Sequence, residues 1–426
     1  MAENADACLD GSDRRPKRGV SSMTEMRLKI AVVGGPMYDR LYEERLPAFT
    51  AETGIAVEVG ARLIHPELND HLAAAYAAGT GDYDLISTHG KYAPAQVGWL
   101  RPLDDILPPG ALDDFSATTV AMARIDGVLF GVPRNVDTRL LHYRSDLFDD
   151  PAERTEFEAQ FGYPLQSPRT WTELAEVARH FSRPPDLYGF AFPGQESGLW
   201  GQFYELVESA GGRFFGPDLR AAFDSPEGGW ALDFLRRLYG EWAVAPPETP
   251  EWQFDAVSAA FDTGRVAMIG DWPAAYGIHA ASPVGDRFDL ALYPAGSQRR
   301  AVYSGGFTWA VPRSSRHPEA AIRLALHLSD EKSQMVEARQ GTMVPRRSVQ
   351  VAIRAEVAPG TRDERRLALL EETVATSMLV PPRFTAYPAV ERAVWPVLQA
   401  GFMGTVPVER ALRDAAAAMD AVVGGR

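Results

Sequence analysis

The chain has 426 residues, more than one hydrophobic core usually serves, so its length predicts two lobes. Its 57 acidic residues outnumber its 43 basic ones, and the formal net charge of −14 argues against nucleic acid or an anionic membrane as a partner. The single cysteine, Cys8, cannot form a disulfide within the chain, and there is neither a CxxC pair nor an HExxH helix. We therefore expect no metal site and no cofactor.

Residues 1–26 are polar and of mixed charge, and we predict that they form a flexible leader. They lack the apolar run of about 7 to 15 residues that an export signal needs, and none follows the Arg14-Arg15 pair. Met23 or Met26 is an alternative start, because the predicted fold begins directly after them. No later stretch approaches the roughly 20 apolar residues that span a membrane.

From residue 27 onward, apolar runs of strand length alternate with amphipathic runs of helix length. Strands are expected at 28–33, 55–59 and 84–87, and helices at 38–52 and 66–78. This order predicts a parallel sheet covered by helices on both faces. Open sheets of this kind bind ligands beyond the carboxyl ends of their strands. The first candidates for a binding site are therefore the three loops at that edge, 34–39, 64–69 and 88–92.

A second group of elements follows a predicted hairpin turn at Asp126-Gly127. The stretch 130–148 is expected to cross into another lobe, and 168–174 to begin the capped helix that comes next. The pattern then predicts helices at 171–181, 200–211, 226–239 and 252–262, with strands at 187–192, 267–269 and 288–293. A strand at 304–312 and a helix at 318–328 are expected to return to the first lobe, before a helical tract at 389–423.

Several local motifs occur in an order typical of one family. They are Pro-Ala-Phe-Thr-Ala-Glu-Thr-Gly-Ile-Ala-Val-Glu-Val from Pro47, Gly-Asp-Tyr-Asp-Leu-Ile from Gly81, Pro-Arg-Thr-Trp-Thr-Glu-Leu from Pro168, Phe-Asp-Thr-Gly-Arg-Val-Ala-Met-Ile-Gly-Asp-Trp from Phe261 and Gly-Thr-Met-Val-Pro-Arg from Gly341. In this order they resemble family 1 of the extracellular solute-binding proteins, the substrate-binding components of carbohydrate ABC importers of the maltose-binding-protein type. The resemblance covers nearly all of residues 27–423.

The resemblance implies an α/β protein with the type II periplasmic-binding-protein fold, in which two α/β lobes are joined by hinge crossings and the ligand cleft lies between them. Lobe I would comprise 27–137 and 291–330, and lobe II 138–290 and 331–426. The implied function is capture of a carbohydrate by hinge closure, followed by presentation to ABC permease subunits in the membrane. The resemblance also implies an extracytoplasmic location, periplasmic or at the cell surface, although no export signal is visible. We expect a monomer, and a binding protein rather than an enzyme.

Carried over by position, the resemblance implies a ligand site that draws on both lobes and on the crossing. Trp200, Trp272, Tyr276 and Tyr387 would be aromatic plates for sugar rings, while Lys91, Asp137 and Glu196 would pair with hydroxyl groups. The other implied residues are Met37, Tyr38, Asp39, His65, His89, Tyr92, Arg139, Gln195, Gly305, Gly306, Phe307 and Arg383. Maltose binders have an acidic-basic pair where this chain has Gly90 and Lys91, which argues against a maltodextrin ligand.

Each of these residues also has a structural interpretation. Trp272 caps a core in one alternative, and Asp137 forms a salt bridge with Arg134 or Arg139 in another. A ligand with a carboxylate or sulfonate, held by Arg139 or Arg383, is a further hypothesis. A glycosidase would need two carboxylates about 5 to 10 Å apart, and a cytosolic sugar-sensing protein would explain the missing export signal. We rank both functions behind the importer component.

Overall fold

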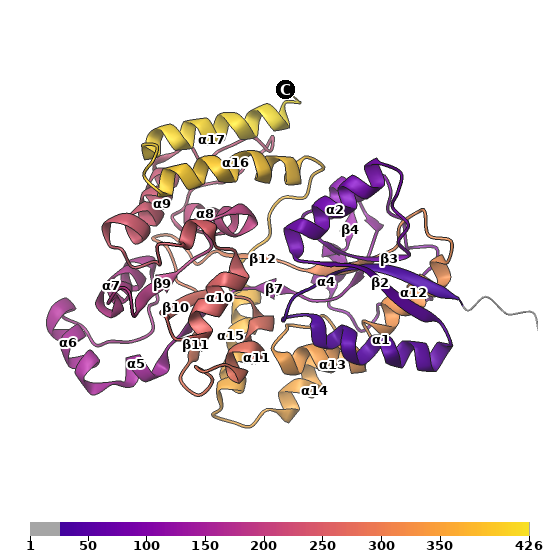
Figure 1. Ribbon diagram of the computed structural model, residues 1–426, viewed down its shortest axis with the longest axis horizontal. Helices are drawn as coiled ribbons and strands as arrows, with labels where there is room; N and C mark the ends of the chain where they lie inside the picture. The colour runs from indigo at the N-terminus through magenta and orange to yellow at the C-terminus, as the bar shows by residue number, and fades with distance from the viewer. Residues whose placement is uncertain (1–25, 426) are drawn as a thin grey trace, which may run out of the picture.

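The computed structural model describes residues 26–425, so all of the predicted leader except Met26 lies outside the described residues. The chain folds into two lobes, each built around its own sheet, and a smaller sheet lies between them (Figure 1). Helices cover the sheet of each lobe. The predicted two-lobed α/β class is therefore confirmed.

The first lobe contains a five-stranded sheet in the order β2-β1-β3-β13-β6. β1 pairs in parallel with β2 and β3, whereas β13 runs antiparallel to β3 and β6. These strands span Arg27–Val33 (β1), Ala56–Leu63 (β2), Leu85–His89 (β3), Val132–Pro133 (β6) and Phe307–Ala310 (β13). The helices of this lobe are α1 (Asp39–Thr53), α2 (His65–Ala77), α3 (Ala93–Gln96), α4 (Ala117–Met122) and α12 (Pro318–His327). The hairpin predicted at Asp126-Gly127 joins β4 (Arg124–Ile125) to β5 (Val128–Leu129).

Apolar spacing explains why α1 forms and where it lies. Its buried face carries Leu41, Leu46 and Phe49, which recur at helical spacing and join the core between the helix and the sheet. The helix ends at Gly54, whose φ of 71° lies in the left-handed region that favours glycine. The chain can then turn back directly into β2.

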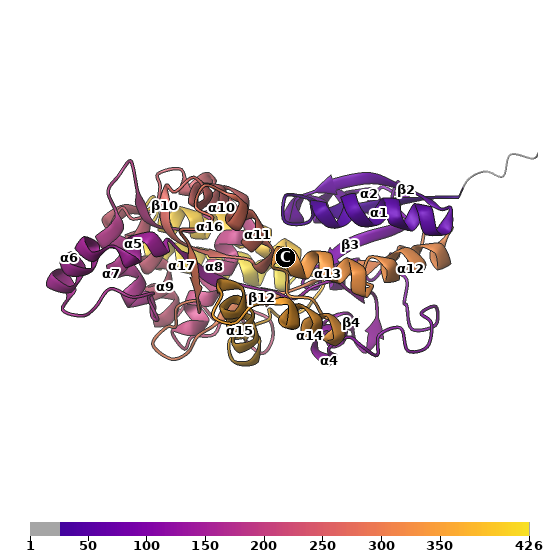
Figure 2. The same cartoon turned by 90° about the horizontal axis from the view of Figure 1, so that it is seen from below.

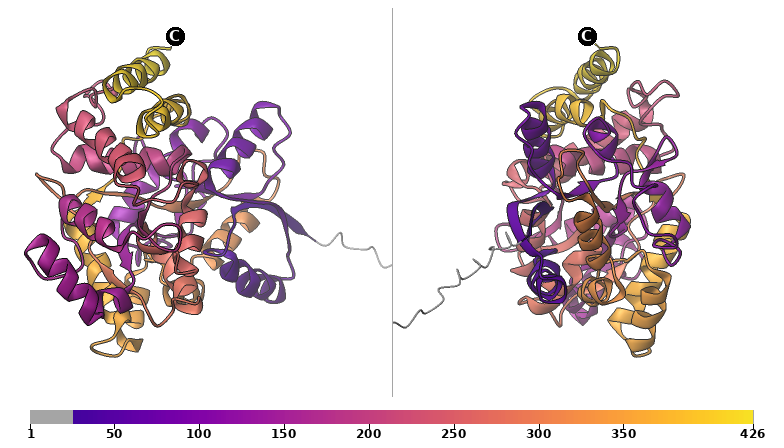
Figure 3. Two further views of the ribbon diagram at one scale, coloured as in Figure 1. Left: turned by 60° about the vertical axis from the view of Figure 1, so that its left-hand side comes forward. Right: turned by 90° about the vertical axis from the view of Figure 1, so that its right-hand side faces the viewer.

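The second lobe contains a four-stranded sheet in the order β11-β8-β10-β9. Its strands span Leu140–Tyr143 (β8), Tyr188–Ala191 (β9), Val266–Asp271 (β10) and Asp289–Ala291 (β11). Its helices are α5 (Ser145–Asp149), α6 (Pro151–Phe161), α7 (Trp171–Phe181), α8 (Glu196–Ser209), α9 (Pro226–Arg236), α10 (Phe254–Asp262), α11 (Tyr276–Ala281), α16 (Tyr387–Phe402) and α17 (Val408–Val423). α16 packs against α8, and α17 covers the outer side of α16 (Figure 3).

The third sheet, in the order β14-β12-β7, lies where the chain passes between the lobes. β7 (Asp137–Thr138) follows β6 and leads into β8. β12 (Val302–Gly305) pairs antiparallel with β7. β14 (Met378–Leu379) pairs in parallel with β12. Residues 304–312, predicted to form one strand, therefore form parts of two strands in different sheets. The break at Gly306 lets the chain leave the crossing sheet and enter the first lobe.

Three helices that the sequence pattern did not indicate follow α12. They are α13 (Glu331–Gln340), α14 (Arg347–Glu356) and α15 (Arg362–Thr376). α13 contacts α1 of the first lobe and α11 of the second, and Figure 2 shows it between the lobes. The lobe boundary that we predict after residue 330 stays a prediction. A smaller difference concerns α8, which begins at Glu196, four residues before the predicted start at Trp200.

A buried ion pair ties the crossing to the second lobe. Arg139, just after β7, donates from Nε to Oε1 of Glu205 on α8 at 3.2 Å, and both side chains are fully buried. The same carboxylate oxygen accepts the backbone N–H of Tyr303 on β12 at 2.7 Å. Glu205 therefore holds both crossing strands to α8.

We predict that Glu205→Gln lowers the free energy of unfolding by about 3 to 5 kcal/mol, because Arg139 would keep a buried charge without its partner. Urea denaturation measures this loss. The matched double variant Arg139→Met/Glu205→Leu removes both charges at similar volume and should lose distinctly less. Equal losses in the two variants would contradict this account of the crossing.

Candidate functional site

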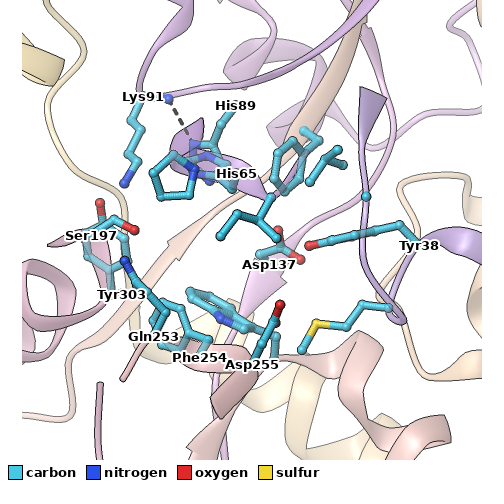
Figure 4. A pocket seen from close by; sticks show the side chains of 17 residues that line it. Tyr38, His65, His89, Lys91, Asp137, Ser197, Gln253, Phe254, Asp255 and Tyr303 are labelled. Atoms are coloured by element: carbon cyan, nitrogen blue, oxygen red, sulfur yellow. Dashed lines mark hydrogen bonds between the residues drawn. The ribbon is translucent and has the colours of Figure 1, made fainter. Parts of the chain in front are cut away.

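A cavity lies between the two lobes, beside the crossing strands, and encloses about 760 Å³ of empty space, counting the part open to solvent (Figure 4). The first lobe contributes the ends of β1 and β3 and the start of α2, and the second contributes the starts of α8 and α10 and the residue after β10. The lining residues are Val33, Gly34, Met37, Tyr38, Ile64, His65, Pro66, His89, Lys91, Asp137, Ser197, Gln253, Phe254, Asp255, Trp272, Tyr303 and Phe307. This position agrees with the loops predicted at the carboxyl edge of the first sheet.

Aromatic side chains form the apolar part of the lining. Tyr38 and Phe307 meet edge to face with their ring centroids 5.8 Å apart, and Phe254 and Trp272 do so at 5.0 Å. The first pair belongs to the first lobe, and the second pair to the second lobe. A ligand in the cavity thus meets aromatic surface from both lobes.

Two histidines of the first lobe supply neutral hydrogen-bonding groups. His89 Nδ1 accepts the backbone N–H of Lys91 at 3.2 Å, which leaves Nε2 as the protonated nitrogen of a neutral ring. Nε2 of His65 is buried without a hydrogen-bond partner among the described residues. Burial lowers the pKa of both imidazoles well below the usual value, and the charge of nearby Lys91 lowers it further. Both rings are therefore uncharged at neutral pH.

Two carboxyl groups face the cavity, one from the crossing and one from the second lobe. Burial raises the pKa of Asp137 to about 7, although the positive charge of Arg134 opposes this shift. Asp137 accepts a hydrogen bond from Asn135 Nδ2 at 2.9 Å. Burial, and then the nearby charge of Asp271, raise the pKa of Asp255. Both carboxyls can accept hydrogen bonds from hydroxyl groups.

Three buried cations that border this region are each paired with a carboxylate of the protein. Lys91 Nζ lies 2.8 Å from Glu391 Oε1, and Arg134 Nε donates to Glu337 Oε1 at 3.0 Å. The third is the Arg139–Glu205 pair of the crossing. Each of these cations therefore has a carboxylate partner within the protein.

Eight of the residues implied by the family resemblance line the cavity. They are Met37, Tyr38, His65, His89, Lys91, Asp137, Trp272 and Phe307. The structure brings these side chains together from the first lobe, the crossing and the second lobe (Figure 4). Their contacts with a ligand stay a prediction.

The other implied residues lie outside this lining. Trp200 and Tyr387 are fully buried in the core of the second lobe, where Trp200 Nε1 donates to the Tyr387 hydroxyl at 2.7 Å. Tyr276 is buried in a second core cluster of that lobe. Asp39 accepts from Arg62 Nε at 2.9 Å. Tyr92, Gln195, Glu196, Arg139, Gly305, Gly306 and Arg383 are likewise absent from the lining.

The two arginines of the anionic-ligand hypothesis are held by other parts of the protein. Arg139 pairs with Glu205, and Arg383 Nη1 donates to the main-chain carbonyls of Met122 and Arg124, each at 2.7 Å. Glu196, predicted to bind hydroxyls, instead accepts from Gln253 Nε2 at 2.6 Å. Gln253 thereby gains a fixed orientation at the cavity.

Sequence reasoning missed the second-lobe residues Ser197, Gln253, Phe254 and Asp255, and the crossing residue Tyr303. The first four lie at or next to the first residues of α8 and α10. A helix was predicted at 252–262, and the residues at its start could have been proposed as site residues on that basis. Nothing in the local sequence indicated that this start faces the first lobe.

Two further observations concern membranes and metals. Within residues 26–425, no helix combines the length and the apolar character needed to cross a bilayer. The same part of the chain contains no group of three or more His, Cys, Asp or Glu side chains that could hold a metal ion.

These features define a two-lobed protein with a ligand-sized cavity between its lobes. The family model of the bacterial extracellular solute-binding proteins matches residues 37–335, and the chain belongs to that family. The resemblance seen in the sequence is thus confirmed. A curated relative, the mannitol-binding protein of Pseudomonas aeruginosa, is 28% identical over 313 residues, which are 69% of this chain and 64% of that protein. The chain therefore spans slightly less than two thirds of that relative's length.

Solved structures share the fold over nearly the whole chain. The maltose-bound MalE3 of T. maritima has a TM-score of 0.82 at 24% identity, covering 93% of this chain and 99% of that one. A solute-binding protein of Thermotoga lettingae bound with α-D-tagatose has a TM-score of 0.81 at 24% identity, covering 94% of this chain and 100% of that one. A solute-binding protein of Agrobacterium radiobacter in complex with ribitol has a TM-score of 0.78 at 21% identity, covering 92% of this chain and 97% of that one. These likenesses confirm the periplasmic-binding-protein fold.

We predict that Gly305→Ala destabilises the protein by about 1 to 3 kcal/mol, as expected for overpacking. A Cβ at this position would lie 2.5 Å from Cε1 of the His89 ring, which has no flexible end to move aside. The control is Gly98→Ala, where a Cβ meets nothing within 4 Å and should cause no loss. Chemical denaturation measures both, and equal stabilities would contradict the close packing of His89.

A buried network supports the backbone beside Trp272 and makes stability depend on pH. Asp271 accepts the Trp272 backbone N–H at 2.7 Å and lies 3.1 Å from His279 Nε2, while His279 Nδ1 lies 2.7 Å from Asp262. Burial alone would lower the pKa of His279, but its hydrogen bonds to Asp262 and Asp271 raise the pKa to about 9. The stabilisation from this imidazolium is therefore complete below about pH 6.5 and is lost as the pH rises through about 9.

We predict that wild-type protein loses about 3 kcal/mol of unfolding free energy from this group between pH 6 and pH 10. His279→Asn should be less stable at pH 6 and should lack this part of the decline. Denaturation at a series of pH values measures the difference between the two proteins. A difference that does not change with pH would show that His279 is neutral in the folded protein.

Proposed function

We propose that this protein is the substrate-binding component of an ABC importer and that it captures a neutral carbohydrate or polyol between its lobes. The lining of the cavity carries this proposal, because uncharged hydrogen-bonding groups lie beside aromatic faces. Sugars and polyols present hydroxyl groups together with C–H surface, and this lining complements both. The mannitol-binding relative and the related structures with maltose, α-D-tagatose and ribitol support the same ligand class.

Selectivity would come from the buried polar groups. Nε2 of His65 lacks a partner among the described residues, and the Asp137 carboxyl keeps acceptor capacity beyond its bond from Asn135. A ligand without the matching hydroxyl would leave such a group unpaired, at about 1 to 3 kcal/mol each.

Capture would be driven by contacts made with both lobes at once. His89 belongs to the first lobe and Asp255 to the second, and both line the cavity. A ligand that touches both favours the closed arrangement, whereas equal affinity for the open and closed forms would shift nothing.

A thermal-shift screen tests the proposal. The panel contains hexoses, pentoses, hexitols, pentitols and short oligosaccharides, with glycerol and sodium chloride as controls. A true ligand at 100 times its Kd should stabilise the native state by about 2.7 kcal/mol and raise Tm accordingly. We expect a saturable shift with at least one sugar or polyol, and no shift with any compound would contradict the proposal.

We predict that Trp272→Ala weakens binding of that ligand by about 30-fold or more, because a buried aromatic contact contributes about 2 kcal/mol. Trp230→Ala is the matched control, since Trp230 is 38% exposed and does not line the cavity. Isothermal titration calorimetry measures both affinities. Unchanged binding by the Trp272 variant would remove this side chain from the site.

The transport role adds a location and a partner to the proposal. We place the protein outside the cytoplasm, in the periplasm or at the cell surface, where a monomer presents its ligand to ABC permease subunits. The family's description as extracellular supports this. Fractionation of native cells tests it, and a chain confined to the cytosol would favour a sugar-sensing function instead.

A glycoside-acting enzyme is the second candidate, because Asp137 and Asp255 both face the cavity. Two carboxyl groups across a sugar-sized space are the minimum requirement for glycoside hydrolysis. Prolonged incubation with a set of aryl glycosides and oligosaccharides decides between the two functions. Product formation that is abolished by Asp137→Asn would replace the binding proposal.

A further inference from the structure

At one end of the cavity, the lining residue Lys91 meets two side chains that do not themselves line the cavity. Lys91 and Tyr92 follow β3 in the first lobe, and Glu391 lies on α16 of the second. Lys91 Nζ lies 2.8 Å from Glu391 Oε1, and the Tyr92 hydroxyl donates to the other carboxylate oxygen. All three side chains are buried. We call Lys91, Tyr92 and Glu391 the end wall.

The end wall packs against aromatic residues of the core of the second lobe. The Lys91 ammonium lies 4.7 Å from the ring centre of Tyr92, 5.6 Å from that of Tyr303 and 5.8 Å from that of Tyr387. The hydroxyls of Tyr303 and Tyr387 lie 2.8 Å apart. Trp200 Nε1 donates to the Tyr387 hydroxyl at 2.7 Å. The wall is thus part of a continuous buried network and not a loose surface contact.

A second cavity lies on the other side of the end wall, between α2 and α16. Its lining includes Tyr92 and Glu391 and shares Pro66 and Ser197 with the main cavity. Its remaining residues are Asn69, Asp70, Glu196, Pro388, Arg392 and Trp395. An aromatic side chain beside several polar ones is chemistry that could receive a further sugar unit. Lys91 lines the main cavity, and its partners Tyr92 and Glu391 line the second one, so the three residues lie between the two spaces.

Passage of a longer ligand would require the wall to come apart. Separating Lys91 from Glu391 would leave two buried charges without partners, and neither could regain full hydration in that position. The pair also joins the two lobes, so a ligand that separated Lys91 from Glu391 would hold the lobes apart.

We infer that the end wall sets ligand length: the site accepts a single sugar ring or a linear polyol of similar size and excludes longer oligosaccharides. The inference rests on the proposed function and deepens it. Lys91, Tyr92 and Glu391 act as specificity-determining residues, because they close the space in which a second sugar unit would otherwise lie. The second cavity then stays empty when ligand is bound.

Calorimetric titration of two double variants tests this inference. Lys91→Ala/Glu391→Ala removes the wall, whereas Lys91→Met/Glu391→Leu removes the charges but keeps most of the volume. The probes are D-mannitol, D-glucose and D-mannose, against maltose, maltotriose and mannobiose. We expect wild-type protein to bind its best monomeric ligand at least 100-fold more tightly than any oligosaccharide. The alanine variant should reduce this ratio to below 10. The Met/Leu variant keeps the volume of the wall but loses the ion pair that resists opening, so it should give an intermediate ratio, between 10 and 100.

A third variant covers the case in which the alanine pair does not fold. Trp395→Ala alters only the second cavity, so it should change the affinity for the best ligand by less than threefold. A tenfold loss of affinity in the Trp395 variant would overturn the inference. So would wild-type protein that binds an oligosaccharide within tenfold of its best monomeric ligand. An unchanged ratio in a folded alanine double variant would overturn it as well. If neither these probes nor any compound of the thermal-shift panel binds wild-type protein, the proposed function falls, and this inference falls with it.

Discussion

The structure depends on the pairing of buried charges around the cavity. Arg134, Arg139 and Lys91 are each matched by a carboxylate of the protein, from Glu337, Glu205 and Glu391 respectively. A buried cation without such a partner would carry a large desolvation cost and would attract an anion into the cavity. Because the protein supplies the anions itself, the space between the lobes is left to neutral imidazoles, carboxyls of raised pKa and aromatic rings. This composition suits a neutral guest rich in hydroxyl groups.

The same pairs also connect different parts of the molecule. The Arg139–Glu205 pair fastens the crossing strands to α8 of the second lobe. The Lys91–Glu391 pair instead spans the two lobes and belongs to the arrangement in which they are close together. Under the proposed function, a ligand that touches both lobes would add to this contact and so favour closure. The proposals for ligand size and for lobe closure thus rest on the same group of residues.

Much of the fold was predictable from the sequence, because apolar periodicity marks α1, α2 and the strands between them. The helix α13 was not predicted, since it buries polar residues such as Ser333, Gln334 and Glu337 that give no apolar pattern. The helices α14 and α15 do carry buried or half-buried apolar residues at helical spacing, so their pattern was available but not used. Among the residues that line the cavity, His89 lies in a loop predicted from the end of a strand, whereas Trp272 was expected from the family resemblance. Trp200 and Tyr387 were expected at the ligand but lie in the core. The sequence around a single aromatic residue does not show whether its ring stacks on a ligand or packs in a core. Asp255 and Glu391 were missed because only the packing of two lobes places them near the cavity.

The most direct test of the central claim compares a neutral ligand with its charged counterpart. Calorimetry at pH 7.5 would measure the affinity for the best-binding sugar or hexitol and for the aldonate in which one terminal carbon of the same skeleton is a carboxylate. With every bordering cation already paired, the account predicts that the carboxylate binds at least 100-fold more weakly. Equal or tighter binding of the anion would show that a cation near the cavity is available to ligand, and would contradict the account.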